Sequence, residues 1–259
     1  MSKRFKQFLN MKKTLSLVTF YLLISTSLLA QISKVDSTLK IYADGDYYFQ
    51  REKYDSALVC YNQAVNNGLR LDFLFFKKGY CEFNSGQYNE AIRDLTASVI
   101  KIPFLKMKEG FTTPGHSFVK GGNGVYWSTL NSVSLQYQYF KAYYFRALSK
   151  YYLEDFYGCV DDFKKLHKSS GDSSYVSCLY LGKALIRTNK LKESEKYFSF
   201  IISQKSNNDL EQSLLGDAYS DRGYLNYRNG LKERACIDWS RGNDLGSDSC
   251  FDYLKKYCK

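Results

Sequence analysis

The sequence predicts an all-α fold of about five antiparallel helix pairs followed by a capping helix at the C-terminus. A 34-residue period supports this fold, because Tyr54-Asp55-Ser56-Ala57 recurs as Tyr88-Asn89-Glu90-Ala91 and Gly45 recurs as Gly79. Between these markers the apolar residues follow helical spacing, and the 259 residues include only two prolines. The 24 tyrosines and 18 phenylalanines supply enough apolar surface for collapse, which excludes a disordered chain.

Residues 1–30 are typical of a secretory signal peptide. They contain five basic residues and no acid, and residues 15–30 form an apolar run interrupted only by Ser and Thr. Ala30 is the expected last residue of the signal. A permanent membrane anchor is disfavoured, because this run has 16 residues, whereas roughly 20 are needed to span a bilayer. We therefore expect an exported protein of the periplasm, the cell envelope or the secreted fraction, with no stable membrane span after cleavage.

The net charge of +11 does not indicate a nucleic-acid partner. Without the five basic residues of the signal, the 37 basic residues fall to 32 against 26 acidic ones, which leaves +6. The longest basic patches, such as Lys190 to Lys196, alternate with acids or fall on expected solvent-facing helix surfaces. We expect no nucleic-acid binding.

The repeated markers resemble the tetratricopeptide repeat (TPR), in which a large residue, Leu-Gly, Tyr, Ala, Phe and Pro stand at fixed offsets. The first two repeats match best. Repeat one, residues 38–71, has Ile41, Gly45, Tyr48, Tyr54, Ala57, Tyr61 and Ala64; repeat two, residues 72–105, has Phe75, Gly79, Gly86, Tyr88, Ala91, Leu95 and Pro103. The residues around Glu52 and Ser85-Gly86 are expected to form the turns within the pairs.

The three later repeats are more degenerate. Repeat three (140–173) has Tyr143, Ala147, Phe156, Cys159 and Phe163; repeat four (175–208) has Leu181-Gly182, Leu185, Ser194 and Phe198; repeat five (216–249) has Gly223, Gly230, Ala235 and Trp239. Residues 248–259 would cap the stack. The resemblance implies an α-solenoid, in which each helix pair buries its apolar face against the next.

Residues 106–139 interrupt the pattern. Six glycine or proline residues between 110 and 124 would break helices, so we expect a long loop over about 106–126 and a helix resuming near Ser128. The expected organisation is a signal peptide (1–30), repeats one and two (31–105), the Gly-containing loop and helical lead-in (106–139), and repeats three to five with the cap (140–259).

No catalytic, cofactor or metal site is predicted. Gly121-Gly122-Asn123-Gly124 lacks the Gly-Lys-Ser/Thr ending of a phosphate-binding loop. His116-Ser117 has no third group to orient a nucleophile, and Asp161-Asp162 would point in different directions on a helix. The only other histidine, His167, is expected to be an ordinary surface residue. We therefore expect a non-enzymatic protein.

The seven cysteines suggest disulfides, which persist in an oxidising compartment. Three pairs have similar spacings of 19 to 22 residues and would lie on neighbouring helices: Cys236 with Cys258, Cys60 with Cys81, and Cys159 with Cys178. The pair of Cys236 and Cys258 is favoured because it would fix the terminal cap. For the other two pairs, the alternative that cysteines simply fill small buried positions remains open.

The resemblance also implies a concave groove, lined by the first helix of each repeat, that binds a peptide or protein. The groove positions transfer to Tyr42, Phe49, Phe76, Tyr80, Phe83, Tyr144, Tyr151, Tyr152, Tyr180, Lys183, Arg187, Tyr224, Tyr227 and Arg228. Tyrosine and arginine often dominate interface energies, although several of these rings could instead pack within the stack. The family's Lys/Asn clamp for a C-terminal carboxylate is absent, because Asp46, Tyr80 and Leu148 stand where Asn is needed.

The leading functional prediction is a protein- or peptide-binding scaffold of the cell envelope that uses this aromatic groove. Two alternatives remain open. One is a structural subunit of an envelope assembly, and the other is an enzyme accessory protein that acts through the 106–126 loop.

Overall fold

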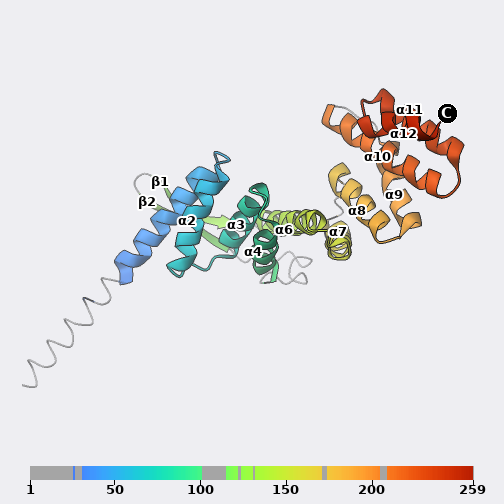
Figure 1. The fold of residues 1–259 in the computed structure, drawn as a ribbon. Coiled ribbons are helices and arrows are strands. Elements are labelled where there is room, and N and C mark those ends of the chain that lie inside the picture. The colour runs from blue at the N-terminus through green and yellow to red at the C-terminus, as the bar shows by residue number, and fades with distance from the viewer. Residues whose placement is uncertain are drawn as a thin grey trace, which may run out of the picture. The chain divides into compact units, whose positions relative to one another are not determined.

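The computed structural model describes residues 26, 31–100, 115–121, 124–130, 132–170, 174–204 and 209–258 (Figure 1). The chain divides into two compact units, one formed by residues 1–71 with 116–129 and the other by residues 72–115 with 130–259. The predicted signal peptide lies outside the described residues, apart from Thr26. No helix within the described ranges is long and apolar enough to cross a membrane.

The first unit contains the first helix pair. A helix over residues 31–49 is followed by α2 (Tyr54–Asn66). Between them Glu52 has a φ of +57°, which reverses the chain at the predicted turn. The ring of Tyr61 is fully buried against the first helix, and its hydroxyl donates a 2.7 Å hydrogen bond to Asp46 Oδ1. Repeat one was predicted over residues 38–71, whereas the first helix of this pair already includes residues 31–37.

The first unit also contains two strands where a loop was predicted. Strands β1 (Gly115–Gly121) and β2 (Gly124–Leu130) pair in a two-stranded sheet, and the next helix begins at Ser132 rather than near Ser128. The expectation of a loop over 106–126 is therefore wrong for the described part of that segment. The glycines do exclude a helix, but the β-branched and aromatic residues between them favour extended backbone.

The second unit contains the remaining helices in sequence. They are α3 (Asp72–Asn84), α4 (Tyr88–Ile100), α6 (Ser132–Tyr152), α7 (Phe156–Ser170), α8 (Tyr175–Arg187), α9 (Leu191–Ser203), α10 (Asp209–Arg228), α11 (Lys232–Asp244) and α12 (Asp248–Tyr257). Each predicted repeat corresponds to one pair: α3 with α4, α6 with α7, α8 with α9, and α10 with α11. The capping helix is α12.

The packing of these helices is that of an α-solenoid. The two helices of each pair pack against each other, and α3, α6, α8, α10 and α12 also pack successively on one another. We call these five helices the first-helix layer. The buried core consists of clusters along the stack, in which Phe163, Leu181 and Leu185 join α6, α7 and α8, and Phe198 and Leu225 join α8, α9 and α10.

Glycine at its repeat position lets the two helices of a pair approach closely. A Cβ atom on Gly79 would lie 2.7 Å from Leu95 Cγ on α4, and a Cβ on Gly223 would overlap the indole of Trp239 on α11. Both residues that occupy this space are fully buried. The glycine periodicity in the sequence therefore reflects a steric requirement.

Candidate functional site

The first-helix layer brings a continuous set of aromatic rings together. Its members, which we call the aromatic strip, are Tyr80 and Phe83 on α3, Phe145, Tyr151 and Tyr152 on α6, and Tyr180 on α8. Neighbouring ring centroids lie 4.6 Å apart for Tyr80 and Phe145, 5.1 Å for Phe83 and Phe145, and 5.0 Å for Tyr151 and Tyr180. The rings of the strip therefore hold one another in place across three repeats.

The strip combines packed rings with an exposed edge. Phe83 and Phe145 are largely enclosed by other rings, whereas the side chain of Tyr152 is 45% exposed. Tyr152 stacks on Tyr88 with centroids 4.9 Å apart, and its hydroxyl lies 3.0 Å from that of Tyr180. This hydrogen bond, together with burial, raises the pKa of Tyr152 to about 12. The exposed edge thus has a fixed shape before any partner binds.

Beyond the strip, two carboxylates face a single ammonium group. Lys183 Nζ on α8 lies 3.2 Å from Asp217 Oδ2 and 3.8 Å from Asp221 Oδ2, both on α10. Asp221 Oδ2 is buried and receives no hydrogen bond from any described residue. Burial raises the pKa of Asp221 to about 7, with Lys183 opposing and Asp217 adding to the shift. Lys183 was predicted from the sequence, but the two acids were missed. Their i, i+4 spacing places them on one face of a helix, and this spacing could have identified them as a pair.

The other predicted groove residues have varied placements. In the first unit, Tyr42 is buried and Phe49 half-buried, and both pack against Tyr61. In the second unit, Phe76 lies next to Tyr80, whereas the ring of Tyr144 packs against buried Phe163. These rings contribute to the stack.

The predicted cations and C-terminal rings lie along the later repeats. The Arg187 guanidinium covers the ring of Phe156 at 4.5 Å, and Arg228 lies 6.0 Å from the ring of Tyr224. Tyr227 packs on Tyr257 of the cap with centroids 4.5 Å apart. Of these residues, Arg187 is nearest to the aromatic strip, because Phe156 contacts Tyr151.

Three repeats contain a buried ion pair that sequence reasoning did not identify. A cation on the first helix binds an aspartate 16 residues later on the second helix, in the pairs Lys78 with Asp94, Arg146 with Asp162, and Arg222 with Asp238. The two arginine pairs are bidentate. In repeat four the equivalent residues are Leu181 and Tyr197. The repeated spacing of Lys or Arg and Asp was visible in the sequence, but solvent-facing charges are the usual interpretation of such residues.

Each arginine of these pairs also reaches the preceding repeat. Arg146 Nη1 donates to Thr96 Oγ1 on α4 at 3.1 Å, and Arg222 Nη1 donates to Ser199 Oγ on α9 at 3.4 Å. Thr96 and Ser199 occupy equivalent places in their own repeats. The ion pairs therefore connect successive repeats as well as the two helices within one repeat.

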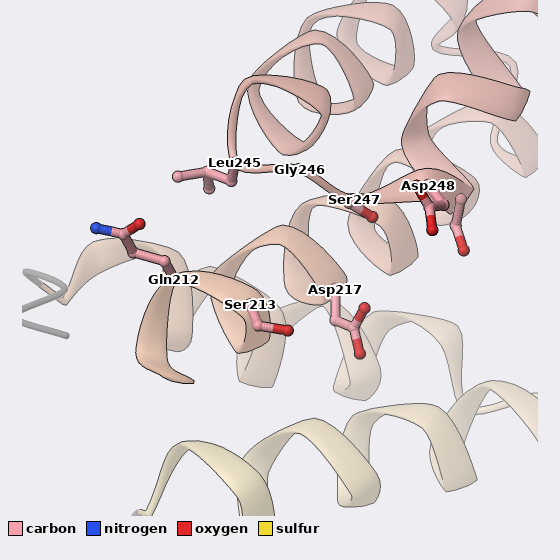
Figure 2. Close-up of a pocket in the computed structure, with 8 residues that line it drawn as sticks. Gln212, Ser213, Asp217, Leu245, Gly246, Ser247 and Asp248 are labelled. Carbon is pink, nitrogen blue, oxygen red and sulfur yellow. The ribbon is translucent and has the colours of Figure 1, made fainter. Parts of the chain in front are cut away.

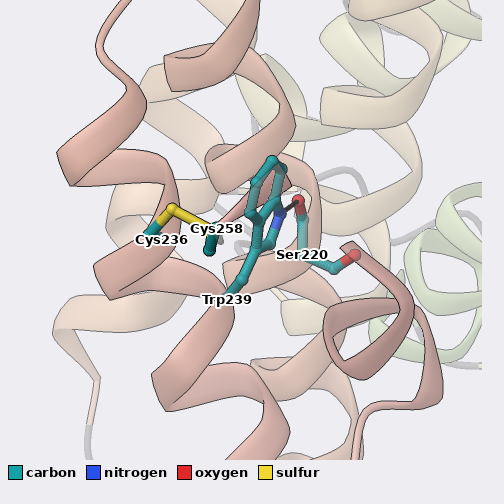
Figure 3. The surroundings of a disulfide bond; sticks show 4 residues. All are labelled: Ser220, Cys236, Trp239 and Cys258. Carbon is teal, nitrogen blue, oxygen red and sulfur yellow. Dashed lines mark hydrogen bonds between the residues drawn. A yellow bond between two sulfur atoms is a disulfide. The ribbon is translucent and has the colours of Figure 1, made fainter. Parts of the chain in front are cut away.

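The C-terminal cap is fixed by a disulfide and a buried indole (Figure 3). Cys236 on α11 and Cys258 after α12 are joined, with Cα atoms 5.8 Å apart. Trp239 is fully buried next to this bond, and its Nε1 donates to the Ser220 carbonyl oxygen at 3.1 Å. The structure thus contains the disulfide that was favoured from the sequence.

The other predicted disulfides are not formed. Cys60, Cys81, Cys159 and Cys178 remain thiols, as does Cys250. Cys159 fills a small position in the core shared by α6, α7 and α8, whereas Cys178 packs in a different cluster with Leu179 and Phe198. The prediction of the pair of Cys159 and Cys178 fails because both cysteines act as small apolar core residues. Cys81 is likewise buried.

An open polar cleft of about 490 Å³ lies at the start of the last repeat (Figure 2). It is lined by Gln212, Ser213 and Asp217 of α10, by residues 245–247 between α11 and α12, and by the first two residues of α12. Figure 2 shows Asp217 on one wall and Ser247 and Asp248 on the other. Asp217 therefore borders both this cleft and the pair with Lys183.

The described residues offer no metal-binding group of three or more His, Cys, Asp or Glu side chains. His167 Nε2 lies within hydrogen-bond distance of Ser177 Oγ, at 3.0 Å. The side chains of His116, Ser117 and residues 121–124 lie outside the described part, so the hypotheses that involve the 106–126 segment remain predictions.

Comparison with known proteins identifies the fold. No protein-family model matches the chain, and no curated protein matches its sequence. A solved structure of MamA (MamA MSR-1 C2) superposes with a TM-score of 0.58 at 14% identity, covering 81% of this chain and 97% of MamA. The structure of YrrB, described as a TPR protein with an unusual peptide-binding site, gives a TM-score of 0.58 at 12% identity, covering 83% and 90%. The predicted tetratricopeptide-type α-solenoid is thereby confirmed.

Proposed function

We propose that the chain is a non-enzymatic scaffold that binds an extended protein or peptide segment along the first-helix layer of its second unit. The observation that carries this proposal is the aromatic strip, whose rings are held in place across three helices while Tyr152 stays 45% exposed. Rigid tyrosines provide large contact areas at low entropic cost. A solenoid presents such side chains along an extended surface.

The peptide-binding site that is stated for YrrB provides a precedent on the same fold. The strip of this chain differs from a bare apolar patch, because hydroxyl groups of Tyr151, Tyr152 and Tyr180 accompany the rings. Such groups can bond to the backbone of an extended segment, while the rings contact its side chains. An extended segment is therefore the proposed occupant of this surface.

The proposed site of action is outside the cytoplasm, in the periplasm, the cell envelope or the secreted fraction. The signal-like residues 1–30 support export. The bond between Cys236 and Cys258 provides independent support, because disulfides persist in oxidising compartments and are rare in the cytosol. Fractionation of cells that express the full chain, followed by N-terminal sequencing, tests this part. A cytosolic chain that retains residues 1–30 would contradict it.

Site-specific photo-crosslinking tests the binding surface. A photoreactive phenylalanine analogue replaces Tyr180 in the first-helix layer or, as a control, Phe200 on α9, which is 37% exposed. With envelope extract, we expect a defined crosslinked partner from position 180 and not from position 200. The crosslink should be lost in Tyr152→Ala and retained in Tyr157→Ala, which removes a 71% exposed ring on α7. Equal crosslinking from both positions would contradict the proposal.

A further inference from the structure

We infer that the segment bound by this scaffold carries a basic side chain, lysine or arginine, which docks against Asp217 and Asp221 next to the aromatic strip. This inference rests on the proposed function, since it names the chemistry of the partner at the same surface. Three observations carry it: the charge balance around Lys183, an unsatisfied carboxylate oxygen, and the tyrosines that surround the two acids.

The charge balance leaves one negative charge uncompensated when both acids are ionised. Lys183 Nζ contacts Asp217 at 3.2 Å and Asp221 at 3.8 Å, so one ammonium group serves two carboxylates. The Asp217 side chain is 44% exposed and remains accessible to a partner. A second cation placed here would balance the charge of the group.

Asp221 also has bonding capacity that the described residues do not use. Its Oδ2 atom is buried and accepts no hydrogen bond from them. A buried acceptor without a hydrogen bond is energetically unfavourable. Lys183 Nζ lies 3.8 Å from this oxygen, so the Asp221 charge is only partly compensated. An ammonium or guanidinium group of a partner would donate to the exposed carboxylate of Asp217 and place its positive charge beside Asp221, and charge-assisted hydrogen bonds of this kind are stronger than neutral ones.

Phenol rings from neighbouring helices complete the surroundings of the acid pair. Burial raises the pKa values of Tyr151 on α6 and Tyr253 on α12, and the charge of nearby Asp221 raises them further. Tyr180 lies 5.9 Å from Lys183 Nζ, measured from its ring centroid. The faces of aromatic rings attract ammonium and guanidinium groups through the ring quadrupole, so they add to the attraction of the two carboxylates. A lysine or arginine side chain fits this chemistry.

The acid pair and the strip also form one continuous surface. Tyr180 and Lys183 are one helical turn apart on α8, and Tyr151 contacts Tyr180. A single extended segment can therefore place an apolar or aromatic residue on the strip and a basic residue on the acids. A small free amine would contact only the two acids and leave the aromatic strip unoccupied.

A positional-scanning nonapeptide library tests the inference with the full chain. Wild type is compared with Asp217→Asn/Asp221→Asn, which keeps side-chain shape, and with Asp244→Asn/Asp252→Asn, which removes two exposed acids elsewhere on α11 and α12. Circular dichroism first establishes that all three are folded. We expect wild type and the control to select Lys or Arg at one peptide position, and the Asp217/Asp221 variant to lose this selection while it keeps the apolar one. Affinity for the best basic peptide should fall roughly tenfold, the scale of one charge-assisted bond.

The possible failures are distinguishable. Peptides that bind through Tyr152 and Tyr180 without any basic preference, or with an acidic one, would overturn the inference and leave the proposed function standing. A basic preference that survives in the Asp217/Asp221 variant would also overturn it. If wild type retains no peptide, or if Tyr152→Ala/Tyr180→Ala binds as wild type does, both the inference and the proposed function are refuted.

Discussion

Replacing Asp162 by asparagine should destabilise the second unit far more than the same replacement of a solvent-exposed aspartate would. Asp162 is the acceptor at the centre of a buried charge group, and its side chain is only 1% exposed. Arg146 Nε and Nη2 donate to its two oxygens at 2.8 and 2.7 Å, and Lys150 Nζ lies 2.9 Å from Oδ2. Asp162→Asn keeps the shape of the side chain, removes its charge and replaces one acceptor oxygen by a donor NH2 group.

The magnitude follows from what the substitution leaves behind. The side chains of Arg146 and Lys150 are 10% and 17% exposed, so neither cation can regain full hydration in the folded state. The guanidinium would keep only neutral partners, among them the hydroxyl of Thr96 and the ring of Tyr143. Breaking a buried pair by removing one partner costs about 3–5 kcal/mol, because the other charge stays buried. We expect a loss of about 3 kcal/mol or more.

The neighbouring aspartate provides the matched control. Asp161 is 61% exposed and pairs with Lys165 at i, i+4 in a 2.6 Å contact. Exposed helix pairs contribute only about 0.3–0.5 kcal/mol. Urea unfolding followed by far-UV circular dichroism, with hydrogen exchange of α6 and α7, measures both variants. If Asp162→Asn lies within about 1 kcal/mol of wild type, or matches Asp161→Asn, the reasoning on buried charge is refuted.

Three further predictions concern pH, the disulfide and helix approach. Burial raises the pKa of Glu82 from 4.5 to about 7, with Lys78 opposing the shift, so the stability that protonation provides is present below about pH 4.5 and lost as the pH rises through 7; Glu82→Gln should therefore weaken the pH dependence of unfolding between about pH 4.5 and pH 7. Loss of the bridge in Cys236→Ser/Cys258→Ser, which spans 22 residues, should cost about 3 kcal/mol, and the unfolded, unreduced wild type should titrate five thiols. Gly223→Ala should cost about 1–3 kcal/mol because its Cβ would overlap the buried indole, whereas Gly216→Ala, with its nearest contact at 3.3 Å, should be tolerated.

Each of these has a contradicting result in thermal or urea unfolding. An unchanged pH profile in Glu82→Gln would show that another group governs the pH dependence. Seven titratable thiols would exclude the disulfide. A Gly223→Ala variant as stable as Gly216→Ala would mean that the helices of repeat five can separate without loss.

The helix pairs were predictable because their sequence signals are local and steric. Tyr54 and Tyr88, 34 residues apart, are the first residues of α2 and α4, and Gly79 leaves room for Leu95. These signals depend on neighbouring turns of one helix pair, so a single sequence contains them. The same holds for Cys236 and Cys258, which lie in adjacent helices.

The remaining features depend on contacts that spacing alone does not determine. In the sequence, Arg146 and Asp162 cannot be told from charged residues on a helix surface. Only the packing of α6 on α7 shows that they are buried. Asp217 and Asp221 became candidates only once α8 placed Lys183 against them. The strands β1 and β2 were missed because glycine indicates the end of a helix without specifying what replaces it.

The arginine bridges between repeats also fix the order in which the repeats can be joined. Arg222 reaches back to Ser199, a small neutral side chain in repeat four. The equivalent residue of repeat three is Lys164, two residues after Asp162 as Ser199 is two after Tyr197. Excising repeat four would therefore place a lysine against Arg222. Although they share one fold, these repeats are not interchangeable modules, and a shortened or shuffled version of the protein would need a compensating substitution at each new junction.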